Sequence, residues 1–195
     1  MDEKELNICI KKYKNNGDTF YFEKIYCHFL SKIYRYIFLK ILDKETAEDL
    51  TSEVFIRVYK NLNKVNLNAI TIKIWIYKIA KNLLTDHFRS SQNKQNVKSL
   101  DEYLEGDKEL ESIGSMLIDQ GEIFSNDNQF KNEKLISALN SLPEMQREII
   151  FLRYVEGMDF KSISLILNKS EIALRALKFR ALENIKGKLI NQVLG

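Results

Sequence analysis

Residues 142–182, LPEMQREIIFLRYVEGMDFKSISLILNKSEIALRALKFRAL, decide how the C-terminal part of the chain folds. Pro143, the only proline, suits the first turn of a helix, where its missing N–H removes no hydrogen bond. The residues after it are strongly apolar and predict a scaffold helix: Ile149, Ile150, Leu152 and Tyr154. Gly157 predicts the end of this helix, because glycine adopts left-handed backbone angles without strain.

Two further helices are predicted after the scaffold helix. Asp159 suits the N-cap of the first, since its short side chain can accept a hydrogen bond from a first-turn N–H. Its apolar residues recur at helical spacing: Ile163, Ile166 and Leu167. Asn168 tolerates the left-handed conformation of a tight turn, and Ser170 suits the N-cap of the second helix. The pattern is that of a helix-turn-helix.

The last of these helices is predicted to bury an apolar line and to expose a basic stripe. The line consists of Leu174, Leu177 and Ala181. If it packs inward, Glu171, Arg175 and Lys178 turn outward. Together with Arg180, the outward cations could contact phosphates or base edges in a major groove. The alternative is a three-helix bundle whose charged face contacts only solvent.

The charge of the chain is unevenly distributed. Its net charge is +3, which is too small to establish a nucleic-acid partner. Residues 1–90 carry 16 Lys and Arg against 11 Asp and Glu, residues 91–133 carry 4 against 10, and residues 134–195 carry 10 against 6. An acidic, polar middle segment therefore separates two basic blocks, and it reads as a linker without a core of its own.

Composition argues against several classes of protein. The only cysteines, Cys9 and Cys27, have no metal or redox spacing, so a reducing cytosol is the simplest location. We expect neither an export signal nor a membrane span, because the apolar run around 33–42 contains Arg35 and Lys40. The sequence contains neither a Cys/His ligand set nor a glycine-rich phosphate loop. We therefore expect no enzyme, no metal site and no cofactor.

The first 42 residues are expected to form two helices. A short helix near Glu5 to Tyr13 should stop at 15–17, and Asp18 should cap a long helix from Phe20 to Leu42. The long helix has an apolar stripe rich in aromatic residues: Phe22, Ile25, Tyr26, Phe29, Ile33, Tyr36, Ile37 and Ile41. Aromatic residues can serve as base-stacking platforms, but their place on the stripe favours a core role.

The next helix is predicted from Glu45 to Leu62, with Asp43 as its N-cap. Its core line is Ala47, Leu50, Val54, Val58 and Leu62. On another face, four charged residues follow one another at intervals of four: Glu45, Asp49, Glu53 and Arg57. The stacked carboxylates admit two interpretations, helix-dipole stabilisation with a Glu53–Arg57 pair or a docking face for a basic partner.

A loop at 63–68 leads to a helix from Thr71 to Leu84, and a further short helix is expected to carry Asp86, Phe88 and Arg89. This segment interleaves basic with aromatic or amide side chains: Trp75, Tyr77, Lys78, Lys81, Asn82 and His87. Such interleaving suits single-stranded or distorted DNA, whose exposed bases accept stacking and amide contacts. A plain amphipathic helix with Trp75 in the core would have a similar sequence.

In their order and spacing, these motifs resemble those of a bacterial RNA polymerase sigma factor, of the extracytoplasmic-function (ECF) type of the sigma-70 family. The resemblance rests on AEDLTSEVFIRVYKNL at 47–62, WIYKIAKNLLTDHFR at 75–89, and the C-terminal stretch with its KFRA motif. It implies an all-α fold with a sigma-2-like helix bundle at 1–90 and a sigma-4-like helix-turn-helix domain at 134–195. The polar acidic linker at 91–133 would join them.

The resemblance also implies roles for particular residues. The acidic helix would dock on the coiled coil of the largest polymerase subunit, through Glu45, Asp49, Glu53 and Arg57. The next segment would melt and read the downstream (−10) promoter element, through Trp75, Lys78, Lys81, Asn82, Asp86 and Arg89. Asn82 would start a loop that captures a flipped base. The helix-turn-helix would read the upstream (−35) element, through Ser170, Glu171, Arg175, Lys178 and Arg180.

The implied partners are core polymerase, promoter DNA and an anti-sigma protein. By this resemblance the protein would be no enzyme by itself and would use no cofactor. The competing interpretation is a helix-turn-helix regulator that binds duplex DNA without joining polymerase, as a dimer on paired half-sites.

The recognition helix departs from the pattern of the family. The family commonly has Thr-Val-Lys/Arg-Ser-Arg-Leu before an aromatic-Arg-Ala motif, whereas residues 173–178 are ALRALK. The usual Arg and Leu have exchanged places at Leu177 and Lys178, and two hydroxyl groups are missing. We therefore expect a helix that is slightly rotated about its axis and a base preference of its own at the upstream element.

Overall fold

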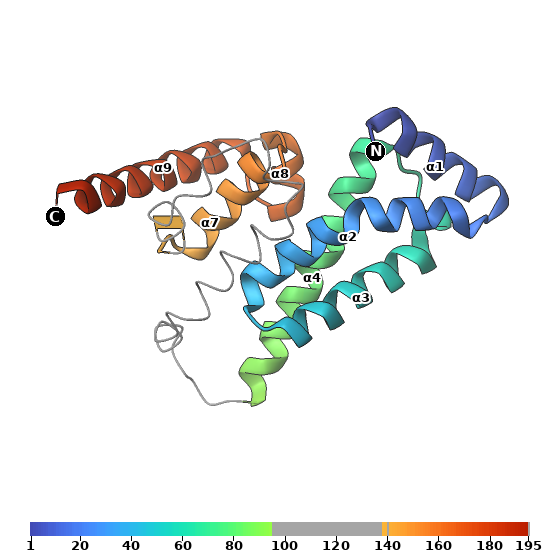
Figure 1. Cartoon of the computed structure of the whole chain (residues 1–195), viewed down its shortest axis with the longest axis horizontal. Coiled ribbons are helices and arrows are strands. Elements are labelled where there is room, and N and C mark those ends of the chain that lie inside the picture. The colour runs from blue at the N-terminus through green and yellow to red at the C-terminus, as the bar shows by residue number, and fades with distance from the viewer. Residues whose placement is uncertain (95–137, 140, 195) are drawn as a thin grey trace. The chain divides into compact units, whose positions relative to one another are not determined.

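The computed structural model describes residues 1–94, 138–139 and 141–194 (Figure 1). Within these ranges the regular structure is helical and no strand occurs, so the predicted all-α class is confirmed. The chain divides into two compact units, 1–97 and 98–195, each of which is described by itself. The linker was predicted at 91–133, but helix α4 includes the first four of these residues and ends at Lys94. The rest of the predicted linker, 95–133, lies outside the described residues.

The N-terminal unit consists of four helices. They are α1 (Glu3–Asn16), α2 (Thr19–Ile41), α3 (Lys44–Asn61) and α4 (Ala69–Lys94), with a short 3-10 turn η1 (Leu62–Lys64) between α3 and α4. Helix α2 contacts each of the other three helices, and α4 also packs against α1 and α3 (Figure 1). The largest fully buried side chains of this unit are Ile10, Ile25, Phe29, Ile33, Tyr36, Ile37, Leu62, Ile72, Ile76 and Tyr77.

Helix boundaries in this unit follow the predicted capping residues. The Asp18 carboxylate accepts a hydrogen bond from the N–H of Phe20, and the Asp43 carboxylate accepts one from the N–H of Thr46, at 3.0 and 2.8 Å. Gly17 ends α1 with a φ of 69°. Because aspartate satisfies free N–H groups and glycine tolerates positive φ, the sequence fixes these ends locally.

The aromatic residues of α2 are mainly core residues, as predicted. Phe22 lies in a ring cluster with Tyr13 of α1 and Tyr59 of α3, at centroid distances of 5.6 and 5.0 Å. Tyr36 packs edge-on against Tyr77 of α4 at 5.2 Å. These contacts join all four helices. Of the rings on the predicted stripe, Phe29 and Tyr36 are buried, and Phe22 and Tyr26 are partly buried.

Helix α4 corrects one prediction. The sequence suggested a helix ending at Leu84, a loop starting at Asn82 and a separate short helix, but α4 is one helix through all of these positions. The segment between Leu84 and Lys94 contains neither glycine nor proline, so nothing in it interrupts the backbone hydrogen bonds.

The described part of the C-terminal unit contains α7 (Glu144–Ile150), the π-helical turn η3 (Phe151–Val155), α8 (Phe160–Leu167) and α9 (Glu171–Leu194). Pro143 is the N-cap residue of α7, one position earlier than predicted. Helix α9 packs against both α7 and α8. The core of this unit contains Ala138, Leu142, Ile149, Ile150, Leu152, Ile163, Leu174, Ala181 and Ile185.

The π-helical turn changes which residues of the scaffold helix are buried. Tyr154, one of the apolar residues from which the scaffold helix was predicted, is 53% exposed, whereas Phe151 is buried. In η3 the N–H of Glu156 donates to the carbonyl of Phe151, five residues earlier. This wider turn shifts the face that follows it, so the helical period of 3.6 fails from Phe151 onward.

Candidate nucleic-acid interface

The helix-turn-helix of α8 and α9 forms as its sequence predicts. The Asp159 carboxylate caps α8 by accepting a hydrogen bond from the N–H of Ser162 at 2.8 Å, and these interactions with Ser162 lower the pKa of Asp159. Asn168 ends α8 with a φ of 53°. The Ser170 hydroxyl then accepts a hydrogen bond from the N–H of Ala173 in the first turn of α9. The turn is therefore held by side chains that belong to it.

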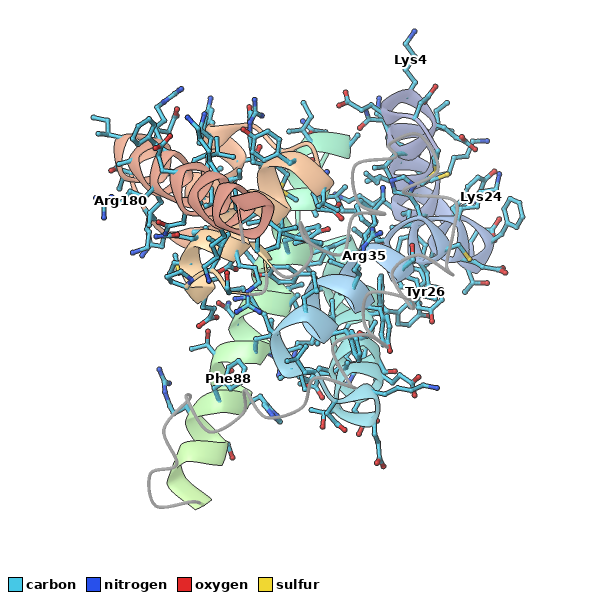
Figure 2. All side chains as sticks on the ribbon, turned by 60° about the vertical axis from the view of Figure 1, so that its left-hand side comes forward. Lys4, Lys24, Tyr26, Arg35, Phe88 and Arg180 are labelled. Atoms are coloured by element: carbon cyan, nitrogen blue, oxygen red, sulfur yellow. The ribbon has the colours of Figure 1, made fainter. Side chains whose placement is uncertain are left out.

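The outward face of α9 differs from the predicted one. Leu174 and Ala181 are fully buried, as expected, but Glu171, Leu177 and Lys178 are all only partly exposed. The most exposed large apolar side chains in the described part of α9 are Ile172 and Phe179, at 81% and 64%. Arg175 and Arg180 are exposed, and Figure 2 shows Arg180 on the outer side of α9. The helix is thus turned so that its cations flank an apolar line.

Three cations surround the ring of Phe160, the first residue of α8. The Arg175 guanidinium lies 4.5 Å from the ring centroid, that of Arg153 at 5.4 Å, and the Lys178 ammonium at 5.9 Å. Arg175 also pairs with Glu171 at 3.4 Å, one turn earlier on α9. Phe160 was not among the predicted site residues, although an aromatic residue directly after an N-cap in a basic region is a detectable signal. The ring holds Arg175 and Lys178 near the α8 side of α9.

The acidic face of α3 is exposed, as predicted. Glu45, Asp49 and Glu53 all lie at the surface at intervals of four residues, which places them on one side of the helix. Glu53 accepts two hydrogen bonds from the Arg57 guanidinium, at 3.0 and 2.8 Å. The predicted pair is therefore present, and Glu45 and Asp49 lie on the N-terminal side of it. Helix-dipole stabilisation accounts for Glu45 alone, because the effect fades after the first turn.

One face of α4 combines basic and polar side chains. Lys78, Asn82 and Arg89 are all exposed, and their spacing places them on one line opposite the buried residues Ile76 and Leu83. Five further positions were predicted as part of this site or beside it. Asp86 is exposed, Trp75, Lys81 and His87 are partly buried, and Tyr77 is fully buried in the core.

Phe88 is an exposed aromatic residue of the same helix segment. Figure 2 shows it at the surface of α4. The line with Lys78, Asn82 and Arg89 therefore has aromatic residues nearby, Trp75 before it and Phe88 close to its end. A ring at the surface can stack on an unpaired base, whereas amide and cationic groups can contact base edges and phosphates.

The described ranges contain no group of His, Cys, Asp and Glu that could hold a metal ion. Cys9 is buried and Cys27 is exposed, and both are free thiols. Among the helices at 1–94 and 138–194, none combines the length and the apolar character that crossing a bilayer requires.

Comparison with known proteins agrees with this arrangement. Residues 25–94 match the family described as Sigma-70 region 2, and residues 132–185 match the family described as Sigma-70, region 4. The first range covers most of α2 together with α3 and α4, and the second covers α7, α8 and the first part of α9. The chain belongs to the sigma-70 family. The presence of both regions favours the interpretation as a sigma factor over that as a separate helix-turn-helix regulator.

Curated relatives identify the type of sigma factor. The ECF RNA polymerase sigma factor BldN of Streptomyces coelicolor is 28% identical over 169 residues, which are 87% of this chain and 60% of BldN. The ECF RNA polymerase sigma factor SigM of Bacillus subtilis is 28% identical over 165 residues, 84% of this chain and 92% of SigM. The sigma factor described here is therefore of the ECF type, although it spans less than two thirds of the length of BldN.

Solved structures show the same fold. The chain matches CnrH, solved in complex with the cytosolic domain of CnrY, with a TM-score of 0.63 and 14% identity over 96% of this chain and 98% of CnrH. It matches the sigma factor RpoE of Bartonella quintana, solved with the anti-sigma factor NepR, with a TM-score of 0.60 and 16% identity over 86% of this chain and 96% of RpoE.

Proposed function

We propose that this sigma factor directs core RNA polymerase to promoters through three separate surfaces. The acidic face of α3 docks on polymerase, the outward line of α4 opens and reads the downstream element, and α9 reads the upstream element. The observation that carries the proposal is the exposure of Asp49 and Glu53 on a helix that also carries five buried side chains. These carboxylates are not needed for the core, so a basic partner gives them a role.

The role of α4 follows from the chemistry of its exposed line. Lys78 and Arg89 can neutralise backbone phosphates, and Asn82 between them offers both a donor and an acceptor to a base edge. A base presents that edge most fully when it is unstacked, so this surface suits opened DNA better than duplex DNA. The contact proposed at Asn82 comes from a helix, not from the start of a loop.

The role of the helix-turn-helix follows from α9. Arg175, Lys178 and Arg180 lie on both sides of its outward face, as a helix in a major groove requires, and Ser170 and Glu171 lie at its first turn. Each DNA surface alone would bind weakly. Because one chain connects them and polymerase holds the chain, the second contact forms at a high effective concentration.

We further propose that this sigma factor acts in the cytoplasm and that an anti-sigma protein controls it. The support is that the two solved structures named above are complexes, with the cytosolic domain of CnrY and with NepR. The factor itself would perform no chemistry; it would supply the promoter address of the polymerase.

The proposal is tested by binding the purified protein to bacterial core RNA polymerase in size-exclusion chromatography. The wild type should elute with polymerase at one to one, and the double variant Asp49→Ala, Glu53→Ala should not. The matched control is Glu48→Ala, which removes an exposed carboxylate on the same helix that pairs with Lys44 at 3.8 Å. A well-folded wild type that does not bind polymerase would contradict the proposed function. Equal binding by the double variant would contradict the assignment to α3.

A further inference from the structure

The first half of the outward face of α9, up to Phe179, is apolar along its centre. Leu174, Ala181 and Ile185 are buried, and the helical period places Ile172, Ala176 and Phe179 on the opposite side. Single exposed apolar residues are common on protein surfaces, but Ile172 and Phe179 lie on one line, two turns apart. With an exposed fraction of 81%, Ile172 is the most exposed large apolar residue in the described part of the chain.

Cations flank this apolar line on both sides. Arg175 and Lys178 lie toward α8, where the Phe160 ring holds them, and the exposed Arg180 lies on the other side. Residues 160–194 contain seven cations, Lys161, Lys169, Arg175, Lys178, Arg180, Lys186 and Lys188, and two acids, Glu171 and Glu183. The partner of this face is therefore a polyanion with apolar groups in the centre of the contact, which favours DNA over a protein.

The side chains at the start of α9 restrict what can be recognised. Ile172 is the second residue of the helix, in the first turn, from which recognition helices reach base edges. Neither Ile172, Ala173 nor Ala176 has a hydrogen-bonding side chain. In the major groove the apolar group that distinguishes one base from the others is the methyl group of thymine.

We infer that Ile172 contacts thymine methyl groups of the upstream promoter element, so that α9 selects thymine partly by apolar contact. Ala173 and Ala176 leave room for the methyl groups, while Arg175 and Arg180 bind the phosphates on either side. This inference rests on the proposed binding of α9 to the upstream element and adds the base and the residue that selects it.

The test deletes the methyl group from the DNA instead of only changing the protein. Core polymerase loaded with the whole 195-residue chain first selects promoters from a pool of duplexes with a random upstream window. The selected duplex is then synthesised with thymine or with deoxyuridine at each thymine of that window, and binding is compared for the wild type and Ile172→Ala. The matched control is Ile8→Ala, which truncates an exposed isoleucine of α1.

We expect the loss of DNA binding caused by deoxyuridine to depend on the Ile172 side chain. Deoxyuridine at the contacted position should weaken binding by the wild type and by Ile8→Ala about threefold to fourfold, the effect of one buried methyl group. It should leave binding by Ile172→Ala unchanged. Because Ile172 is exposed, the variant should keep the thermal unfolding temperature of the wild type.

Three results would overturn the inference. Equal binding of thymine and deoxyuridine duplexes by the wild type would show that no methyl group is read. Equal sensitivity in Ile172→Ala would assign the methyl contact to another residue. Loss of polymerase binding in Ile172→Ala, while Ile8→Ala still binds polymerase, would make this face a protein-docking surface. A holoenzyme that selects no upstream sequence would instead contradict the proposed function of α9.

Discussion

The guanidinium carbon of Arg175 lies 4.5 Å from the centre of the Phe160 ring, so that a residue of α9 rests on the first residue of α8. Glu171 pairs with the same guanidinium at 3.4 Å. Two contacts from two directions restrict the rotamers of Arg175 before DNA is present. A restrained side chain loses less conformational entropy when it binds, so Phe160 should strengthen DNA binding without contacting DNA.

We therefore predict that Phe160→Leu weakens binding of the holoenzyme to its upstream element by about twofold to fivefold, since a cation–π contact at an exposed site contributes about 0.5–1 kcal/mol. Binding to core polymerase should not change. The measurement is a titration of promoter duplex at constant salt, with Phe160→Tyr as the control that keeps the ring. Equal affinity of Phe160→Leu and the wild type would show that Arg175 needs no positioning.

Substitution by alanine should change the free energy of unfolding in opposite directions at two glycines. Gly157 has a φ of 63°, and Gly187 lies inside α9; a Cβ at either position would meet no heavy atom within 4 Å. Alanine at Gly157 would be forced into the left-handed region, at a cost of about 1 kcal/mol. Alanine at Gly187 should stabilise the helix by about 0.5–1 kcal/mol, because glycine is a poor helix former. Urea unfolding of both variants checks the prediction, and a destabilised Gly187→Ala would contradict it.

The predicted helix ends agree with the structure because they depend on local chemistry. Asp18, Asp43, Asp159 and Ser170 cap helices through hydrogen bonds to N–H groups two or three residues away. Such contacts need no knowledge of the rest of the fold. The exposed acidic face of α3 was predictable for the same reason, since a period of four residues determines it.

The errors concern features that depend on packing between helices. The sequence could not show that η3 widens the scaffold helix and exposes Tyr154, because a π-helical turn has no simple signal. It predicted that Glu171, Arg175 and Lys178 turn outward. The two cations instead contact Phe160, and Ile172 is the most exposed apolar residue of the outward face. Basic residues in a DNA-binding helix were predicted to contact DNA because of their charge, whereas Ile172 was assigned no role.

His28 should make the N-terminal unit sensitive to mild acid. Burial lowers its pKa to about 4 from an ordinary value of 6.5, and the positive charges of Lys32, the N-terminus and Lys73 add to the effect. The folded state therefore favours neutral His28, so its contribution is fully present above pH 6.5 and is lost as the pH falls toward 4. The histidine is half-buried, so we expect the loss to be about 1 kcal/mol or less for each pH unit.

The measurement for His28 is the urea-unfolding free energy at several pH values between 7 and 4. In this range the unfolding free energy of His28→Gln should fall less steeply than that of the wild type. His87→Gln, which removes the other imidazole, should show the same fall as the wild type. A decline of the same slope in His28→Gln would assign the acid sensitivity to other groups.

Asn82 allows stability and promoter opening to be separated. It is exposed in the interior of α4, where asparagine is a weaker helix former than alanine by about 0.5 kcal/mol. Asn82→Ala should therefore unfold at a slightly higher urea concentration than the wild type. Its amide is the proposed contact with an unstacked base, so the same variant should form open promoter complexes more slowly. Permanganate reactivity of unpaired thymines in the downstream element measures this step.

The matched control for Asn82→Ala is Thr85→Ala, an exposed position on the same line of α4. The Thr85 hydroxyl donates a hydrogen bond to the carbonyl of Lys81 at 3.0 Å, inside its own helix. A stabilised Asn82→Ala that opens promoters at the wild-type rate would leave this amide without a role in reading the downstream element.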